Sequence, residues 1–377
     1  MTDRCCLALL VVMFMAPLGA AVADEELLPP GVRSVLDVRK VPDDTLSVYV
    51  EDLDSGDAVL EWYPDEPRNP ASTMKLLTTL VALDKLGPTY RWKTDIYALG
   101  DIVDGRLQGD LLLKGHGDPF LVTERAWQMV RRIRHEGIDE IEGDLLLDDS
   151  WFDVGDHAPA AFVRRPLRAY NVAPTALMMN FKVVRYWFEP NGEAVEVRLD
   201  PQLHNLRVDN RLGTRKGYCG GYQRGIAVSM NGNNDEVVFS GRFPDGCKRY
   251  AMDRTALTHN EFAYGLVRSL WEDSGGVIDG GWRNATVDED AEPLFSFESL
   301  PLTDIISSVN KHSNNVMARQ VLFTLAAEEL GPPGTEQGGR EVISTWLEDN
   351  GLKTDAIFLE NGAGLSRESR ITAKAMS

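Results

Sequence analysis

The chain has 377 residues, of which 43% are hydrophobic and 26% are charged, and its formal net charge is −19. This composition is that of a globular protein with two or three domains and argues against extensive disorder. The acidic balance argues against a nucleic-acid-binding protein and against a polybasic membrane-surface protein, because both need clustered positive charge.

The amino terminus has the pattern of an export signal. Residues 5–19 form an apolar run, and an Ala-x-Ala sequence at residues 21–23 follows it and precedes acidic residues. Pro17 and Gly19 interrupt the run and no basic cluster follows it, which argues against a membrane-spanning helix. We therefore expect residues 1–23 to be a signal peptide that is cleaved on export.

The cysteine pattern agrees with export. Cys5 and Cys6 lie within the expected signal peptide, which leaves Cys219 and Cys247 in the mature chain. An oxidising compartment would pair these two residues, and two buried free thiols are the alternative. The sequence has no C-x-x-C motif, and its histidines show no metal-ligand spacing, so we expect no metal site.

The hydrophobic pattern predicts helical segments on both sides of a β-rich middle. In chain order, we expect a hairpin over 45–63, a helix over 72–86, strands over 93–114, a helix over 124–136, a β-rich stretch from about 180 to 290, helices over 302–330 and a helix over 339–350. Trp127, Val130 and Ile133 recur at helical steps and predict the buried face of one helix. Residues 315–330 are expected to be amphipathic. This order favours one domain interrupted by an insertion.

A short internal repeat lies within the predicted strands. Gly-Asp-Leu-Leu-Leu occurs at residues 109–113 and again at 143–147. Two copies are too few for a solenoid. We expect both copies to be Gly-Asp turns that lead into buried strands.

An S-x-x-K motif opens the helix predicted over 72–86. Three residues separate Ser72 from Lys75, which places both side chains on one helix face. Pro70 disfavours helix before it, so Ser72 is expected at the helix amino end, where negative charge is stabilised. The apolar helix is expected to lower the pKa of Lys75 and to make it a base. An ordinary helix cap explains Ser72 equally well on spacing alone, and Ser308 and Lys311 repeat the spacing inside a predicted helix.

An S-x-N motif lies between two predicted helices, at Ser313 and Asn315. A loop at such a position can project a hydroxyl and an amide into a cleft. Helix capping is the alternative for Ser313. Two further S-x-N sequences begin at Ser229, in a β segment leading to an Asn-Gly turn, and at Ser308.

An early S-x-x-K and a late S-x-N together are typical of penicillin-interacting serine acyl-transferases. The chain resembles the class C low-molecular-mass penicillin-binding proteins, the D-alanyl-D-alanine carboxypeptidase/endopeptidases. Five segments carry the resemblance in order: residues 69–79, 113–119, 141–152, 310–315 and 360–367. The chain departs from the family pattern at His116, where Gly is usual, at Asn361, where Asp is usual, and at Ala363, where Ser is usual.

The resemblance implies an α/β (α+β) penicillin-recognising serine transferase fold with a large β-rich insertion. Residues 24–92 and 291–377 are then expected to form a split catalytic, transpeptidase-like domain, and residues 93–290 an insertion of two subdomains. The family carries a K-T-G motif on a strand beyond the segment that resembles 360–367. The sequence contains no such motif there, so we expect the carboxy-terminal part of the catalytic domain to be missing from this chain.

The resemblance also implies an activity. A serine-type D-Ala-D-Ala carboxypeptidase/endopeptidase of the periplasm would act on peptidoglycan stem peptides through an acyl-enzyme, bind β-lactams covalently, and need no cofactor, metal or nucleic acid. In these terms Ser72 is the nucleophile and Lys75 its base. Ser313 passes a proton to the leaving group, Asn315 holds the substrate amide and Lys75, and Arg367 contacts the substrate.

Two other functions remain open at this point. A serine β-lactamase shares both motifs, although Ser72 and Ser313 lie further apart in this sequence than in such enzymes. A non-catalytic peptidoglycan-binding protein would keep the fold without turnover, and the missing K-T-G motif is compatible with it. The sequence indicates neither the balance of carboxypeptidase and endopeptidase activity nor the oligomeric state.

Overall fold

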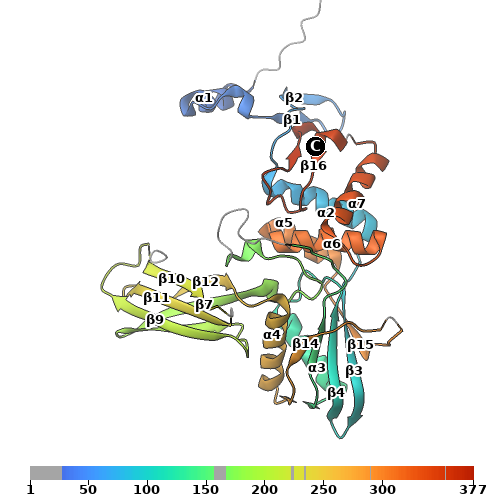
Figure 1. Cartoon of the computed structure of the whole chain (residues 1–377). Coiled ribbons are helices and arrows are strands. Elements are labelled where there is room, and N and C mark those ends of the chain that lie inside the picture. The colour runs from blue at the N-terminus through green and yellow to red at the C-terminus, as the bar shows by residue number, and fades with distance from the viewer. Residues whose placement is uncertain (1–27, 157–166, 222–224, 233–234, 289, 353) are drawn as a thin grey trace, which may run out of the picture. The chain divides into compact units, whose positions relative to one another are not determined.

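The computed structural model describes residues 28–377 except 157–166, 222–224, 233–234, 289 and 353 (Figure 1). The expected signal peptide, residues 1–23, therefore lies outside the described residues. The chain divides into two compact units. The larger one is Pro67–Ile371, and the smaller one comprises the described residues up to Glu66 together with Thr372–Ser377.

The smaller unit contains the hairpin expected over 45–63. Its strands pair antiparallel, and the end of the chain adds a short helix against the first strand. Arg33 joins the first helix to the hairpin, because its guanidinium pairs with Asp43 at 3.0 Å and lies over the Trp62 ring. The elements are α1 (Pro30–Arg39), β1 (Val48–Glu51), β2 (Ala58–Trp62) and α8 (Ala373–Met376).

The helices of the larger unit pack around α6. This helix contacts α2, α5 and α7, and every residue from Val316 to Ala327 is buried. The helices are α2 (Met74–Leu86), α5 (Leu302–His312), α6 (Asn315–Leu330) and α7 (Glu336–Asp349). A short two-stranded sheet follows them in sequence, formed by β16 (Ile357–Phe358) and β17 (Arg370–Ile371).

A seven-stranded sheet follows α2 in the chain. Its order is β13-β5-β4-β3-β15, and β6 pairs with both β4 and β14. Helices α3 (Thr123–His135) and α4 (His259–Asp273) share its main hydrophobic core. The strands are β3 (Lys93–Val103), β4 (Arg106–Gly115), β5 (Glu140–Ile141), β6 (Leu145–Asp148), β13 (Val277–Ile278), β14 (Trp282–Asn284) and β15 (Phe295–Glu298).

The internal repeat forms one paired unit within this sheet. Leu111, in the first copy, pairs with Leu145, in the second, and the two strands continue in parallel register. Arg283 bridges the aspartates of both copies, at 2.6 Å from Asp110 and 3.2 Å from Asp144. The expectation of two turns was wrong for the first copy, because Asp110 lies inside the long strand β4.

A six-stranded sheet forms the remaining β-rich part, with the order β10-β11-β9-β8-β7-β12. A disulfide joins Cys219 to Cys247, which confirms the expected pairing. The strands are β7 (Val183–Asn191), β8 (Ala194–Asp200), β9 (Arg207–Arg215), β10 (Ile226–Met230), β11 (Glu236–Pro244) and β12 (Tyr250–Thr255).

Two details of the predicted helices were wrong. Helix α6 is not amphipathic, because neighbouring elements cover all of its faces and leave no solvent-exposed side over most of its length. Trp127 does not belong to the buried face of α3. It is 45% exposed, with the Arg131 guanidinium over its ring, and Met129 and Ala126 fill the core beside Val130.

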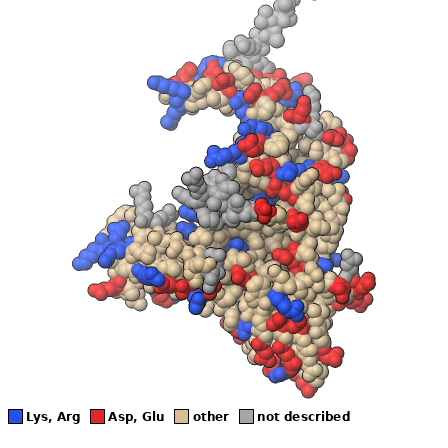
Figure 2. All heavy atoms as spheres, in the orientation of Figure 1, with Lys and Arg blue, Asp and Glu red and all other residues tan. Residues whose placement is uncertain are grey.

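Acidic side chains are spread over the face shown in Figure 2 and gather near the tip of the β3–β4 hairpin. None of the helices in the described part of the chain is both long and apolar enough to cross a membrane. The expected split into a catalytic domain and an insertion at residues 93–290 stays a prediction, because residues 67–371 form a single compact unit.

Candidate active site

The S-x-x-K serine lies on a tight turn at the start of α2. Ser72 is the middle residue of a 3₁₀ turn, Ala71–Thr73, that leads directly into the helix. Thr73 donates from its hydroxyl to the carbonyl of Pro70 at 2.7 Å, which closes the turn. Ser72 is exposed, so its hydroxyl is accessible at the amino end of a helix, as the sequence predicted.

The lysine of the motif is buried beneath this serine. Lys75 is 1% exposed, and its Nζ atom donates to Ser72 Oγ at 3.2 Å. The same nitrogen donates to Asn315 Oδ1 at 2.7 Å and to the carbonyl oxygen of Ala363 at 2.5 Å. An ammonium group has three protons to donate, and three acceptors surround this one. The structure thus brings together Ser72, Lys75 and Asn315 from two distant parts of the sequence.

Burial changes the acidity of this lysine. Removal of the ammonium from water lowers the pKa of Lys75 from 10.5 to about 8. Among the described residues, all three hydrogen-bond acceptors of Nζ are uncharged, so no carboxylate hydrogen bond opposes this shift. About one molecule in ten therefore carries a neutral amine here at pH 7, and that amine can accept a proton.

The S-x-N motif forms the junction of α5 and α6. Ser313 ends α5 in a left-handed conformation, and Asn314 caps α6 by accepting from the backbone amides of Val316 and Met317. Asn315 is the first residue of α6, which directs its amide oxygen to Lys75. Within the described residues the Ser313 hydroxyl has no hydrogen bond to Ser72 or Lys75. Its expected proton relay therefore stays a prediction.

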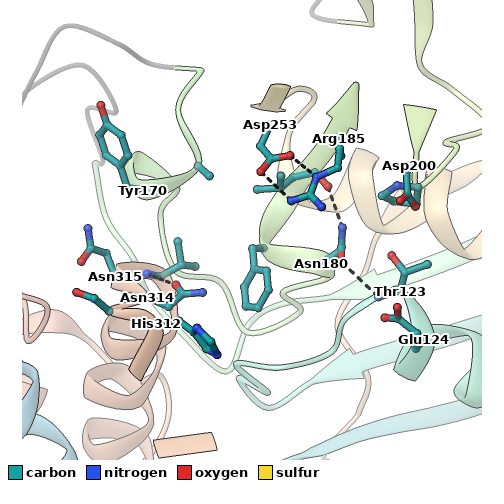
Figure 3. A pocket seen from close by; sticks show the side chains of 16 residues that line it. Thr123, Glu124, Tyr170, Asn180, Arg185, Asp200, Asp253, His312, Asn314 and Asn315 are labelled. Carbon is teal, nitrogen blue, oxygen red and sulfur yellow. Dashed lines mark hydrogen bonds and ion pairs between the residues drawn. The ribbon is translucent and has the colours of Figure 1, made fainter. Parts of the chain in front are cut away.

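A cleft of about 520 Å³ begins at this junction. Figure 3 shows His312, Asn314 and Asn315 on one side of it and residues of the β-rich part on the other. Arg185 there pairs with Asp253 at 2.8 Å, while Glu124 and Asp200 add further negative charge. The remaining residues that line the cleft are Thr123, Ala169, Tyr170, Asn180, Phe181, Val183, Pro201, Ser313 and Val316.

The loop at residues 360–367 accepts hydrogen bonds from two side chains of α2. Thr78 donates from its hydroxyl to the carbonyl of Gly362 at 2.8 Å, one residue before the carbonyl that receives Lys75. The sequence marked residues 360–367 as a segment of interest but did not indicate this contact with the lysine. The two glycines of the segment were the available signal, because Gly362 and Gly364 both have positive φ.

The other candidate residues of the sequence lie in the loop after Ala363, in α5 and in β10. Arg367 is exposed and follows Ser366 in the same loop, so its expected contact with substrate stays a prediction. Ser308 lies within α5, and Ser229 lies within β10, so neither heads a turn at a helix start. The part of the chain that the structure describes contains no cluster of three His, Cys, Asp or Glu side chains able to hold a metal ion.

The family model of D-Ala-D-Ala carboxypeptidase 3 (S13) matches residues 31–377. The chain belongs to this family. The resemblance drawn from the sequence is thereby confirmed.

Two curated relatives are consistent with this family. A D-alanyl-D-alanine carboxypeptidase of Actinomadura sp. (strain R39) is 28% identical over 86% of this chain and 62% of its own length. The carboxypeptidase DacB of Haemophilus influenzae is 23% identical over 81% of this chain and 64% of its own length. The chain thus spans less than two thirds of these curated relatives.

Solved structures confirm the expected fold. The crystal structure of penicillin binding protein 4 (dacB) from Haemophilus influenzae has a TM-score of 0.75 with this chain and 21% identity, covering 88% of this chain and 73% of that one. A second structure of that protein is complexed with a novel β-lactam and has a TM-score of 0.69, with 20% identity over 87% of this chain and 72% of that one.

Proposed function

We propose that this family member is a serine-type D-Ala-D-Ala carboxypeptidase/endopeptidase that acts on peptidoglycan stem peptides. One observation carries the proposal: the amine of a buried lysine lies 3.2 Å from an exposed serine hydroxyl at a helix amino end. A serine hydroxyl is a weak nucleophile unless a neighbouring base removes its proton. Lys75 is in hydrogen-bond reach of Ser72, and its lowered pKa supports that role.

Acylation begins with proton transfer. Neutral Lys75 accepts the proton of Ser72 Oγ as this oxygen forms a bond to the carbonyl carbon of the penultimate D-alanine. We infer that the Ser72 amide, at the start of α2, donates to the developing oxyanion. The new ammonium keeps its acceptors on Asn315 and Ala363, so charge forms without rearrangement of the site.

Collapse of the tetrahedral intermediate releases the leaving amine. The proton held by Lys75 passes to the nitrogen as the carbon–nitrogen bond breaks, and we infer that Ser313 relays it. The peptide remains as an ester on Ser72. Water then attacks the ester, Lys75 takes its proton, and the return of that proton to Ser72 Oγ restores the enzyme.

The cleft beside Ser313 gives the substrate room. Its volume of about 520 Å³ is within the range of ligand-binding clefts. The side chains of Tyr170 and Phe181 offer apolar surface, while Glu124 and Asp200 offer negative charge. We infer that peptide beyond the scissile bond lies here, and that Arg367 contacts the substrate from the loop that follows Ala363.

We further propose that β-lactams acylate the same serine and that the protein acts in the periplasm. A β-lactam is an acylating agent with the same type of reacting carbonyl, and a β-lactam complex of the related Haemophilus influenzae protein has been solved. The Cys219–Cys247 disulfide supports an oxidising location, because cytosolic thiols are kept reduced.

Covalent labelling with a fluorescent penicillin tests this function in the protein as its gene encodes it. We expect Ser72→Ala to abolish the label and Ser308→Ala, which alters the other S-x-x-K, to leave it intact. Slow loss of the label and release of D-alanine from a D-Ala-D-Ala peptide are expected. Rapid release of hydrolysed penicillin would instead indicate a β-lactamase, and absence of label would indicate a protein without acyl transfer.

A further inference from the structure

The turn that presents Ser72 is held in an unfavourable backbone conformation. Ala71, the residue before the serine, has a φ of 47°. A residue with a Cβ atom is strained in this left-handed region, and such strain persists only where surrounding contacts enforce it. The groups that hold Ala71 therefore decide where the serine hydroxyl lies.

Asn69 supplies two of these contacts. Its Oδ1 atom accepts from the backbone amide of Ala71 at 2.8 Å. Its Nδ2 atom donates to the carbonyl of Ser366 at 2.8 Å, across 297 positions of the sequence. One side chain thus fixes the strained residue and fastens it to the distant loop.

The same loop meets the turn at a second point. A Cβ atom at Gly364 would lie 1.7 Å from the carbonyl oxygen of Ala71, so the two backbones are in close contact there. The neighbouring carbonyl of Ala363 accepts from Lys75. The loop that Asn69 holds is therefore the one that also orients the lysine.

Burial does not require Asn69 to find hydrogen-bond partners within the protein, because Asn69 is an exposed residue. Water would satisfy its amide without any protein partner. Both of its polar groups nevertheless bond to backbone, one to the residue before Ser72 and the other to the loop that contains Ser366.

We propose that Asn69 is a positioning residue for the acylation step. It holds the Ala71 turn so that Ser72 Oγ stays within reach of Lys75, and it does not itself touch the substrate. This inference rests on the proposed function, since it assigns a role in the reaction of Ser72.

Asn210 provides a matched control. It is also exposed, and its Nδ2 donates to the Val195 carbonyl at 2.6 Å while its Oδ1 accepts from the Leu212 amide at 3.2 Å. The pattern of bonds is thus the same, but it lies in the six-stranded sheet. Removal of either side chain removes two hydrogen bonds to the backbone, and only Asn69 bonds to the residue that precedes Ser72.

The test measures the reaction of penicillin with Asn69→Ala and Asn210→Ala by stopped flow, which separates the initial dissociation constant from the acylation rate constant. We expect Asn69→Ala to lower the rate constant by about 10²-fold, since a small displacement of a reacting group has that effect. The dissociation constant should change by less than about threefold, because Asn69 does not bind the ligand. Asn210→Ala should change neither. Equal rate constants in both variants would overturn the proposal.

A second variant and a second measurement cover the other outcomes. If Asn69→Ala does not fold, Asn69→Leu decides, because leucine keeps a side chain of similar size but makes neither the bond to the Ala71 amide nor the bond to the Ser366 carbonyl. A lowered acylation rate constant in Asn69→Leu supports the proposal and a parental one overturns it. If the parent is not labelled at all, the proposed function fails. Hydrogen exchange over residues 67–76 then still decides: faster exchange in Asn69→Ala than in Asn210→Ala supports a hold on the turn, and equal exchange refutes it.

Discussion

Lys75 and Asn315 are 240 positions apart in the sequence, and their side chains share a hydrogen bond of 2.7 Å. The bond joins the start of α2 to the start of α6 at the point where Ser72 is exposed. Because α6 is buried along most of its length, Asn315 is a fixed acceptor for the lysine. The helical core therefore sets the position of the base relative to the nucleophile.

The pH dependence of acylation follows from the buried amine. Since burial lowers the pKa of Lys75 to about 8, the fraction of neutral base rises as the pH increases from 7 to 9. We expect the penicillin acylation rate constant to rise through an apparent pKa of about 8 and then to level off. Lys75→Arg should lose about 10²–10⁴-fold in rate, because arginine does not deprotonate. A pH-independent rate constant in the parent would contradict the role of Lys75.

A charge placed at Asn361 should move this profile. Asn361 accepts from the Ala363 amide, and the carbonyl of Ala363 accepts from Lys75, so both side chains bond to the backbone of one residue. A carboxylate there would favour the ammonium form, so we expect Asn361→Asp to raise the pKa of Lys75 and to shift the acylation profile to higher pH. Asn210→Asp, remote from the site, is the control. A shift to lower pH, or none, would show that the field of this side chain does not reach the base.

Gly364 is predicted to be indispensable for the nucleophile turn. Its φ is 70°, and an added Cβ would collide with the Ala71 carbonyl. Gly351 has a φ of 72° with nothing within 4 Å of its Cβ position, so it reports the backbone cost alone. We expect Gly351→Ala to cost about 1–2 kcal/mol of unfolding free energy. Gly364→Ala should cost more and should also remove penicillin labelling. Equal stability and labelling of the two variants in urea unfolding and gel assays would disprove the contact.

Asp118 is predicted to make stability depend on pH. It is 4% exposed, and burial raises its pKa from 3.8 to about 6. The native state therefore holds this proton more tightly than the unfolded chain does. The resulting stabilisation is fully present below about pH 4 and is lost as the pH rises through about 6.

The substitution Asp118→Asn isolates this contribution. It keeps an oxygen for the Phe120 amide, which Asp118 Oδ1 accepts at 2.8 Å, and it removes the ionisation. We expect the variant to exceed the parent in unfolding free energy by about 1–3 kcal/mol at pH 7. The two should be similar at pH 4. The same difference in unfolding free energy at both pH values would show that ionisation of Asp118 does not cause it.

Local sequence signals predicted the parts of the site that lie within a few residues of each other. The spacing of Ser72 and Lys75, and Pro70 before them, correctly placed a serine at a helix start over a lysine. The S-x-N motif correctly placed Asn315 at a helix junction. These features depend on helix geometry, which a short stretch of sequence determines.

Contacts made by backbone groups could not be predicted in this way. The carbonyl of Ala363 accepts from Lys75 across 288 positions, and a carbonyl has no side chain to mark it. Asn69 is similar, because its partner is the backbone of Ser366. Helix α6 was read as amphipathic because its covering elements come from distant segments, and the parallel pairing of the two Gly-Asp-Leu-Leu-Leu segments is likewise a tertiary event.

The identity of the acylated residue tests the central claim most directly. The protein as its gene encodes it is incubated with a β-lactam at pH 8, digested, and examined by mass spectrometry for the modified peptide. Our account predicts a single covalent adduct on Ser72, and its loss in Lys75→Met. An adduct on Ser308 or Ser313, or acylation of Ser72 at the parental rate without Lys75, would contradict it.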